Sequence, residues 1–232
     1  MTKREKTTKE NKKRRACIRL HKKLPQILER IDTQLSHKNL TQRKVSAAVV
    51  LIMHKLMIRV GSEKSRTEHD HYGITTLLPQ HVTVTGDTVQ FQFVGKAGVP
   101  WNRSLADSRI AKIISELKAG AENQLFWYKD GTKQVDLTDN DIRDWLAPFN
   151  VNPKDLRTHK ANLLMYEELM ARATQGLSRS AARVEVRETF DLVAEHLGHQ
   201  PATCRGQYVF PALWKGFVET GGQVPTGPFG VQ

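Results

Sequence analysis

Residues 81–96, HVTVTGDTVQFQFVGK, interrupt a chain whose other segments mostly carry helical patterns. Polar and apolar residues alternate on both sides of Gly86 and Asp87, which predicts two antiparallel strands joined by a tight turn. The chain is therefore expected to be predominantly helical with a small antiparallel sheet, an α+β fold. The second strand leads directly into a turn that carries Lys96. A turn lysine is usually only solvated, but at this position it can also swing into a site as a proton donor.

Apolar spacing on either side of this hairpin predicts helices. Upstream they cover residues 16–35, where Pro25 kinks or splits the run, and residues 41–58, which are apolar around most of the helix and belong to the core. Downstream they cover about 107–118, 138–147, 153–174, 178–196 and 201–219, with a short extended piece at 125–128. We expect one domain over residues 16–220, between a flexible basic tail at 1–15 and a loose tail at 221–232.

The formal net charge of +12 implies an anionic partner, nucleic acid before membrane. Residues 1–15 hold eight Lys or Arg against two Glu, a net charge of +6. This segment is either a disordered tail that aids solubility or an arm that adds non-specific phosphate contacts. Deleting it should flatten the salt dependence of DNA binding only if it is an arm.

The two cysteines, Cys17 and Cys204, form no CxxC pair, which favours a reducing compartment and argues against a structural zinc site. No signal peptide is visible, and the longest apolar stretch, residues 45–58, is too short to span a bilayer. We therefore expect a cytoplasmic, DNA-associated protein. Residues 69–71, His-Asp-His, could imitate a metal site, but a polar loop before the hairpin is the simpler explanation, so we expect no metal and no cofactor.

Five residues form a set suited to attack on a phosphodiester. They are Arg59, Lys96, Arg157, His199 and Tyr208. A tyrosine phenol can displace a sugar oxygen from phosphorus, and the cations can stabilise the charge that develops there. Arg59 follows the buried helix, where its charge needs either a carboxylate or an anionic ligand.

Each of these residues also has a plainer interpretation. Leu197-Gly198-His199 and Tyr208 could be a helix end and a core aromatic residue, and Arg157 could pair with a nearby carboxylate such as Asp155 or Glu167. What favours the catalytic interpretation is that all five residue types occur in the order Arg, Lys, Arg, His, Tyr.

In five segments the chain resembles the catalytic domain of type IB DNA topoisomerases of the small poxvirus-like and bacterial kind. These segments are Ile58-Arg59-Val60-Gly61-Ser62-Glu63, Tyr72-Gly73-Ile74-Thr75-Thr76-Leu77 with His81-Val82, Phe91-Gln92-Phe93-Val94-Gly95-Lys96, Lys154-Asp155-Leu156-Arg157-Thr158, and Leu197-Gly198-His199-Gln200-Pro201 through Tyr208. The resemblance covers roughly residues 40–215. The strand that ends in Gly-Lys and the Lys-Asp-Leu-Arg-Thr motif are specific, whereas the Leu-Gly-His motif is shared more widely.

Tyrosine recombinases are the alternative, because they share the nucleophile and the Leu-Gly-His motif. They typically carry a histidine three residues before the second arginine, where this chain has Lys154. They also lack the strand segment ahead of the lysine turn. Both points favour the topoisomerase; a third possibility is a DNA-binding module without catalysis.

The resemblance implies a role for each residue of the set. Tyr208 would attack phosphorus, Arg59, Arg157 and His199 would bind the non-bridging oxygens, and Lys96 would protonate the leaving 5′ oxygen. Further contacts to DNA are expected from Lys64, Arg66, His81, Lys154 and Arg205. The expected partner is double-stranded DNA, bound by a monomer.

The resemblance also exposes a difference. Relatives usually carry a small β-rich N-terminal domain that closes around the duplex. Here the helix that leads to Arg59 begins only some forty residues into the chain, so we expect a catalytic-domain fragment or a minimal enzyme, with weak and salt-sensitive DNA binding.

Overall fold

The computed structural model describes residues 3–224 and 227–229, and the side chains from residue 7 onward. The chain separates into two compact units. One unit, here called the sheet unit, contains residues 23–153; the other, the tyrosine unit, contains residues 1–22 and 154–232. The single domain expected over residues 16–220 therefore includes residues of both units. Helix α1 (Lys3–Leu35) contributes to each of them, and the chain passes between them again at Pro153.

The sheet unit is built around the predicted hairpin. Strands β1 (Val82–Thr85) and β2 (Thr88–Val94) pair in antiparallel fashion around Gly86, which has a positive φ of 56°. A third strand, β3 (Pro100–Ala106), pairs with the other edge of β2. The sequence did not reveal β3, because only Trp101 and Leu105 are buried in a segment that begins with proline.

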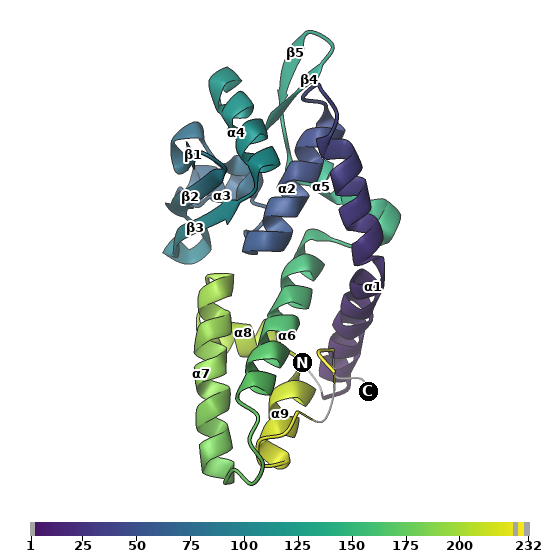
Figure 1. Cartoon of the computed structure of the whole chain (residues 1–232), viewed down its shortest axis with the longest axis vertical. Coiled ribbons are helices and arrows are strands. Elements are labelled where there is room, and N and C mark those ends of the chain that lie inside the picture. Colours follow the sequence, from purple (N-terminus) through teal and green to yellow (C-terminus); the bar gives the residue numbers. More distant parts are fainter. Residues whose placement is uncertain (1–2, 225–226, 230–232) are drawn as a thin grey trace. The chain divides into compact units, whose positions relative to one another are not determined.

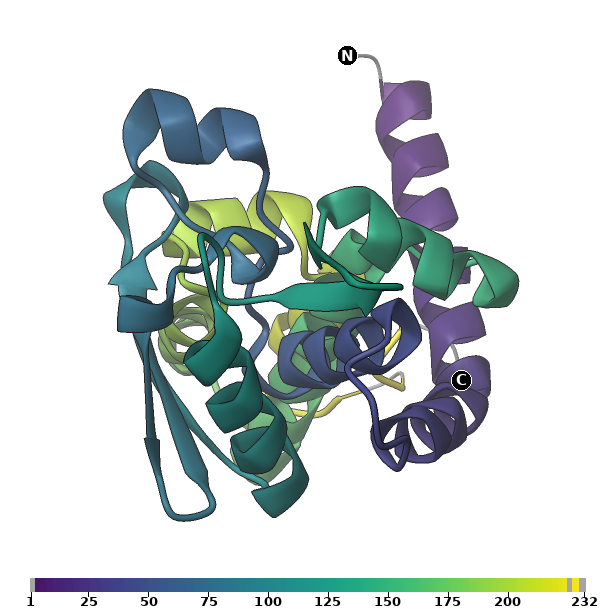
Figure 2. The same ribbon diagram turned by 90° about the horizontal axis from the view of Figure 1, so that it is seen from above.

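Helices cover this sheet. The long buried helix is α2 (Gln42–Leu56), which packs against β3, and α4 (Ser108–Gly120) packs against β1 and β2 (Figures 1 and 2). The rest of the unit comprises α3 (Glu63–His69), η1 (Ile74–Thr76), η2 (Pro79–His81), η3 (Lys96–Gly98), β4 (Trp127–Asp130), β5 (Lys133–Asp136), α5 (Asp139–Leu146) and η4 (Ala147–Phe149). Thr41, Asp107 and Thr138 cap α2, α4 and α5, each by accepting a backbone N–H at the helix start.

The tyrosine unit is helical. It comprises the first part of α1 with α6 (Pro153–Ala171), α7 (Arg179–Leu197), α8 (Pro201–Gln207) and α9 (Pro211–Glu219). Both α8 and α9 pack against α7 (Figure 1). None of the helices in the described part of the chain is long and apolar enough to cross a membrane.

The basic segment at residues 1–15 differs from the flexible tail that we expected. From Lys3 onward it is the beginning of α1, which continues to Leu35 as one helix although Pro25 lies inside it. The segment is ordered because Cys17 and Leu20, in the next turns of the same helix, are buried in the tyrosine unit. A helix that is anchored there can extend toward its N-terminus through residues with good helix propensity, among them Lys, Arg and Glu.

The single helix expected over residues 201–219 is two helices. α8 ends at Gln207 and α9 begins at Pro211. Proline has no N–H to donate and disfavours a helical residue before it, and Phe210 accordingly has extended angles (φ −75°, ψ 129°). Tyr208 therefore lies at a break between two helices.

The expected loose tail at residues 221–232 is only partly described, since 225–226 and 230–232 lie outside the described residues. Phe229 is buried and packs with Cys17 and Phe210 in a small apolar cluster. Its ring also lies against His21 and His159. This part of the tail is therefore packed because its aromatic side chain fills the space between α1 and α6.

Candidate active site

Tyr208 ends α8 and is buried, with 3% of its surface exposed. Its N–H donates to the Cys204 carbonyl at 3.0 Å, the last bond of the helix. The N–H of Val209 donates to the same carbonyl at 3.2 Å. The candidate nucleophile is therefore held by the helix end rather than by a mobile loop.

Arg157 and His199 lie beside it. Arg157, on α6, is 3% exposed, and its Nη2 donates to the Leu197 carbonyl at 2.7 Å and lies 3.1 Å from His199 Nε2. The His199 ring is centred 4.8 Å from the Tyr208 ring. The structure thus brings three of the five predicted residues together in the tyrosine unit.

Gly198 explains how His199 reaches this place. It ends α7 in the left-handed conformation (φ 59°), where glycine is favoured. The chain turns back there, so that the His199 N–H donates to the Ala194 carbonyl at 2.9 Å. The Leu-Gly-His motif is therefore a helix C-cap that places His199 beside Arg157 and Tyr208.

Two cations face the ring of Tyr208. The Lys154 Nζ lies 5.5 Å and the Arg157 guanidinium carbon 5.7 Å from the ring centroid. A cation in such a position is attracted to the face of an aromatic ring, and it stabilises the phenolate form of a tyrosine still more. Lys154, expected only as a DNA contact, is thus also a neighbour of the candidate nucleophile Tyr208.

Asn162 is a buried residue of the site that we did not single out in the sequence. Its Nδ2 donates to the Tyr208 carbonyl at 2.9 Å and to the Thr158 carbonyl at 2.7 Å, and its Oδ1 accepts the Phe210 N–H at 2.8 Å. The amide therefore satisfies backbone groups at the break between α8 and α9. A single sequence does not reveal this role, because an asparagine five residues after Arg157 in a helix could serve many different structural purposes.

Cys204 lies one turn before Tyr208 and is fully buried. Burial raises the pKa of its thiol to about 12, although the charge of Arg157 acts in the opposite direction. The thiol stays protonated near neutral pH, so Cys204 is a poor nucleophile itself.

Arg59 belongs to the sheet unit. We expected the helix before Arg59 to continue to residue 58. Instead α2 ends at Leu56 and is capped by Met57 (φ 58°), so Arg59 lies in the segment that follows the helix. The Arg59 carbonyl accepts the Ile74 N–H at 2.8 Å. A Cβ on Gly73 would come within 2.3 Å of the Gly61 Cα, so glycine is required for this close approach. The half-buried arginine is therefore fixed through its backbone.

Lys96 lies in the turn between β2 and β3, and its side chain is exposed. The turn is closed by the Gly95 N–H, which donates to the Val99 carbonyl at 2.8 Å. Trp101 packs so closely against Gly95 that a Cβ there would lie 2.7 Å from the indole ring. The backbone of this turn is therefore fixed, while the side chain of Lys96 extends into solvent.

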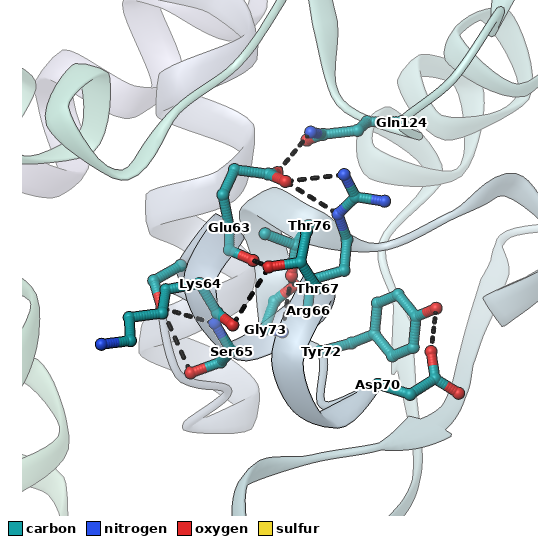
Figure 3. A network of polar contacts seen from close by, with 11 residues as sticks. Glu63, Lys64, Ser65, Arg66, Thr67, Asp70, Tyr72, Gly73, Thr76 and Gln124 are labelled. Atoms are coloured by element: carbon teal, nitrogen blue, oxygen red, sulfur yellow. Dashed lines mark hydrogen bonds and ion pairs between the residues drawn. The ribbon is translucent and has the colours of Figure 1, made fainter.

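The expected DNA contacts at α3 differ in their surroundings (Figure 3). Arg66 donates twice to Glu63 Oε2, at 2.9 and 2.7 Å, and this bond raises the pKa of the guanidinium. The other Glu63 oxygen accepts from Gln124 Nε2 at 2.7 Å. Lys64 points away from this network in Figure 3, with its Nζ 3.9 Å from Glu68. Lys64 is thus better placed than Arg66 to meet a phosphate.

The other expected contacts, His81 and Arg205, lie against aromatic rings. The Nδ1 of His81 accepts the Leu78 N–H at 3.1 Å, and burial lowers the pKa of the imidazole, so this ring is neutral near pH 7. The guanidinium of Arg205 lies 4.8 Å from the centroid of Phe190 and 5.0 Å from that of Trp214. Neutral His81 can only donate a hydrogen bond to DNA, whereas Arg205 keeps its charge at the surface.

The His-Asp-His segment has other contacts. Asp70 accepts the hydroxyl proton of Tyr72 at 2.6 Å, and the rings of His69 and His71 are 5.7 Å apart. Within residues 3–224 and 227–229, no three His, Cys, Asp or Glu side chains are grouped so that they could hold a metal ion.

The sequence of the chain matches a known family. Residues 2–209 match the family described as eukaryotic DNA topoisomerase I, catalytic core, so the chain belongs to that family. The matched span contains all five residues of the predicted catalytic set.

Individual relatives are distant. The chain is 24% identical over 180 residues to DNA topoisomerase 1B of Acanthamoeba polyphaga mimivirus, covering 72% of this chain and 53% of the relative. It is 23% identical over 174 residues to DNA topoisomerase I of Monkeypox virus, covering 74% and 54%. It is 26% identical over 151 residues to DNA topoisomerase 1 beta of Arabidopsis thaliana, covering 63% and 16%. The chain spans about half the length of the viral relatives.

Proposed function

We propose that this chain relaxes supercoiled DNA by cutting and resealing one strand through Tyr208, as a type IB topoisomerase. The observation that carries the proposal is the grouping of the buried Tyr208 ring with His199, Arg157 and Lys154. The substrate is double-stranded DNA, bound by a monomer. The net charge of +12 supports a polyanionic substrate.

In the cleavage step, the phenol of Tyr208 loses its proton to water and its oxygen bonds to the scissile phosphorus. The bond from phosphorus to the 5′ oxygen breaks, and Lys96 gives a proton to that oxygen. The products are a 3′-phosphotyrosyl link and a free 5′-hydroxyl. A free phenol has a pKa of about 10, so nearby cations such as Lys154 and Arg157 help by favouring the phenolate.

The guanidinium groups of Arg59 and Arg157 bind the non-bridging oxygens, with His199 as a third donor. Their charge stabilises the transition state more than the ground state, because negative charge builds on these oxygens during attack. The covalent link keeps the energy of the phosphodiester, so resealing needs no nucleotide and no metal. Between the two steps the free 5′ end swivels and supercoils relax. Lys64, Arg66, His81, Lys154 and Arg205 add contacts along the duplex.

The test uses supercoiled plasmid in the presence of EDTA. The wild-type chain should relax both signs of supercoil and leave a covalent protein–DNA adduct on a denaturing gel. Tyr208→Phe should bind the same DNA with similar affinity but form no adduct, since the ring remains and only the nucleophilic oxygen is lost. Relaxation by Tyr208→Phe would refute the proposal.

Two other outcomes point to other functions. Strand exchange between paired sites, with little relaxation, would indicate a tyrosine recombinase. DNA binding without any adduct in the wild-type chain would indicate a binding module. Raising the salt concentration during relaxation adds a further check, because we expect weak, salt-sensitive binding and distributive relaxation. Processive relaxation well above physiological salt would contradict this expectation.

A further inference from the structure

The N-terminal part of α1 lies beside the nucleophile within the tyrosine unit. Cys17 is fully buried and packs with Phe210, which follows Tyr208 by two residues. One turn earlier, the guanidinium of Arg14 lies 5.7 Å from the centroid of the Phe210 ring. The C-terminal end of the basic segment is therefore held against the chain that carries Tyr208.

Lys13, the neighbour of Arg14, makes the most direct contact. Its Nζ donates to the Gln207 carbonyl at 3.1 Å. Gln207 is the last residue of α8, where carbonyls lack partners within the helix and carry the negative end of its dipole. The ammonium thus binds the peptide group that joins Gln207 to Tyr208.

The charge of Lys13 also acts on the site. Its pKa is lowered, first by burial and then by repulsion from Lys154, while attraction to Glu10, Cys17 and Tyr208 acts in the opposite direction. Lys13 is therefore close enough to Lys154 and Tyr208 for their charges to interact. A cation in this position favours the phenolate of Tyr208 over the neutral phenol.

We propose that Lys13 is a positioning residue for Tyr208: it fixes the peptide ahead of the nucleophile and adds a second ammonium, beside Lys154, to its surroundings. The proposal rests on the proposed function. It gives the basic N-terminal helix a local task in the cleavage step, in addition to any general attraction for DNA. The Gln207 carbonyl is the third backbone group in this stretch that a side chain binds, since Asn162 binds the Tyr208 carbonyl and the Phe210 N–H.

The test compares Lys13→Gln with Lys12→Gln, each in the full chain. Lys12 is exposed on the same turn of α1, so its substitution measures what the loss of one positive charge costs by itself. Single-turnover cleavage of a short duplex at saturating protein gives the rate of the covalent step. Gel-shift titration in the Tyr208→Phe background gives the affinity separately.

We expect Lys13→Gln to cleave about tenfold more slowly than Lys12→Gln at saturation. This factor corresponds to the lower end of the free energy that a hydrogen bond from a charged donor contributes. Both variants should weaken DNA binding equally. The pH–rate profile of Lys13→Gln should move to higher pH, because one cation that favours the phenolate is lost. Lys13→Arg, which keeps the charge and can reach the carbonyl, should recover the rate to within about threefold.

Equal saturated rates for Lys13→Gln and Lys12→Gln would overturn the proposal. So would a slow Lys13→Gln variant with an unchanged pH profile, no recovery by Lys13→Arg and a lowered melting temperature, since these together indicate a purely structural role. If neither the wild-type chain nor Lys12→Gln forms an adduct, the proposed function fails, and this inference fails with it.

Discussion

Tyr208 and Lys96 occupy opposite kinds of surroundings. Tyr208 is 3% exposed and is contacted by His199, Arg157 and Lys154, whereas Lys96 is exposed in a turn between two strands. Under the proposed function this difference has a chemical reason. Attack on phosphorus needs a nucleophile and its charge-binding groups in one geometry before the substrate arrives. A proton donor to a leaving oxygen gains from a long side chain that can follow that oxygen.

Lys96→Ala should produce the largest effect of the variants that test this comparison. Cleavage and resealing should both slow by about 100-fold or more, the usual contribution of a general acid. Thermal stability should change by less than about 0.5 kcal/mol, because an exposed side chain is lost. Single-turnover rates in both directions and a thermal melt measure the two quantities.

A sulfur-substituted substrate sharpens this test. If sulfur replaces the scissile 5′ oxygen, the leaving thiolate needs little protonation, because a thiol has a pKa near 8.5. Lys96→Ala should then cleave at nearly the wild-type rate. Persistent slowness on this substrate, or a clear loss of stability, would show that the turn lysine has a structural task instead.

Asn162→Leu tests the buried side of the comparison. It leaves the Tyr208 carbonyl and the Phe210 N–H without their partner, and each buried orphan costs about 1–3 kcal/mol. Unfolding in urea should therefore show a loss of about 2–5 kcal/mol in stability, and the saturated cleavage rate should also fall.

Asn162→Asp is the matched variant for this position. It keeps an acceptor for the Phe210 N–H, but only its protonated form can donate to the Tyr208 carbonyl, so its cleavage rate should fall relative to the wild type as rising pH ionises the carboxyl. Stability within about 0.5 kcal/mol of wild type for Asn162→Leu would mean that the break between α8 and α9 does not depend on this amide.

Lys64→Gln and Arg66→Gln should give the smallest effects. Lys64 is exposed, so its loss should weaken DNA binding and reduce the slope of log affinity against log salt by about one. Arg66 is bonded twice to Glu63, so removing it should change the slope less. Filter-binding titrations at several salt concentrations compare the two; an equal change of slope would show that DNA displaces Glu63 from Arg66.

Several elements were predictable because their signals are local. Alternating residues around Gly86 specified the β1–β2 hairpin, and Thr41, Asp107 and Thr138 marked helix starts. Gly198 ends α7 next to His199, as its place in the Leu-Gly-His motif suggests. In each case a few neighbouring residues determine the backbone conformation.

Other features were not predicted, either because a local signal was overlooked or because they depended on distant parts of the chain. Periodicity extended one helix across Tyr208, although Pro211 marks where it breaks. The basic segment at residues 1–15 reads as a tail, because the buried residues that anchor it, Cys17 and Leu20, lie further along α1. Phe229 lies in a Gly- and Pro-rich segment, and its burial depends on α1 and α6.

The sequence by itself determined the identity and order of the five proposed catalytic residues, most of the helices, the hairpin and the family resemblance. Only the tertiary structure decided what holds the nucleophile. Lys13 and Gln207 are 194 residues apart, and Asn162 and Tyr208 are 46 apart. Local patterns record propensities of neighbouring residues, whereas these bonds form only when packing buries a backbone carbonyl or brings a charge to it.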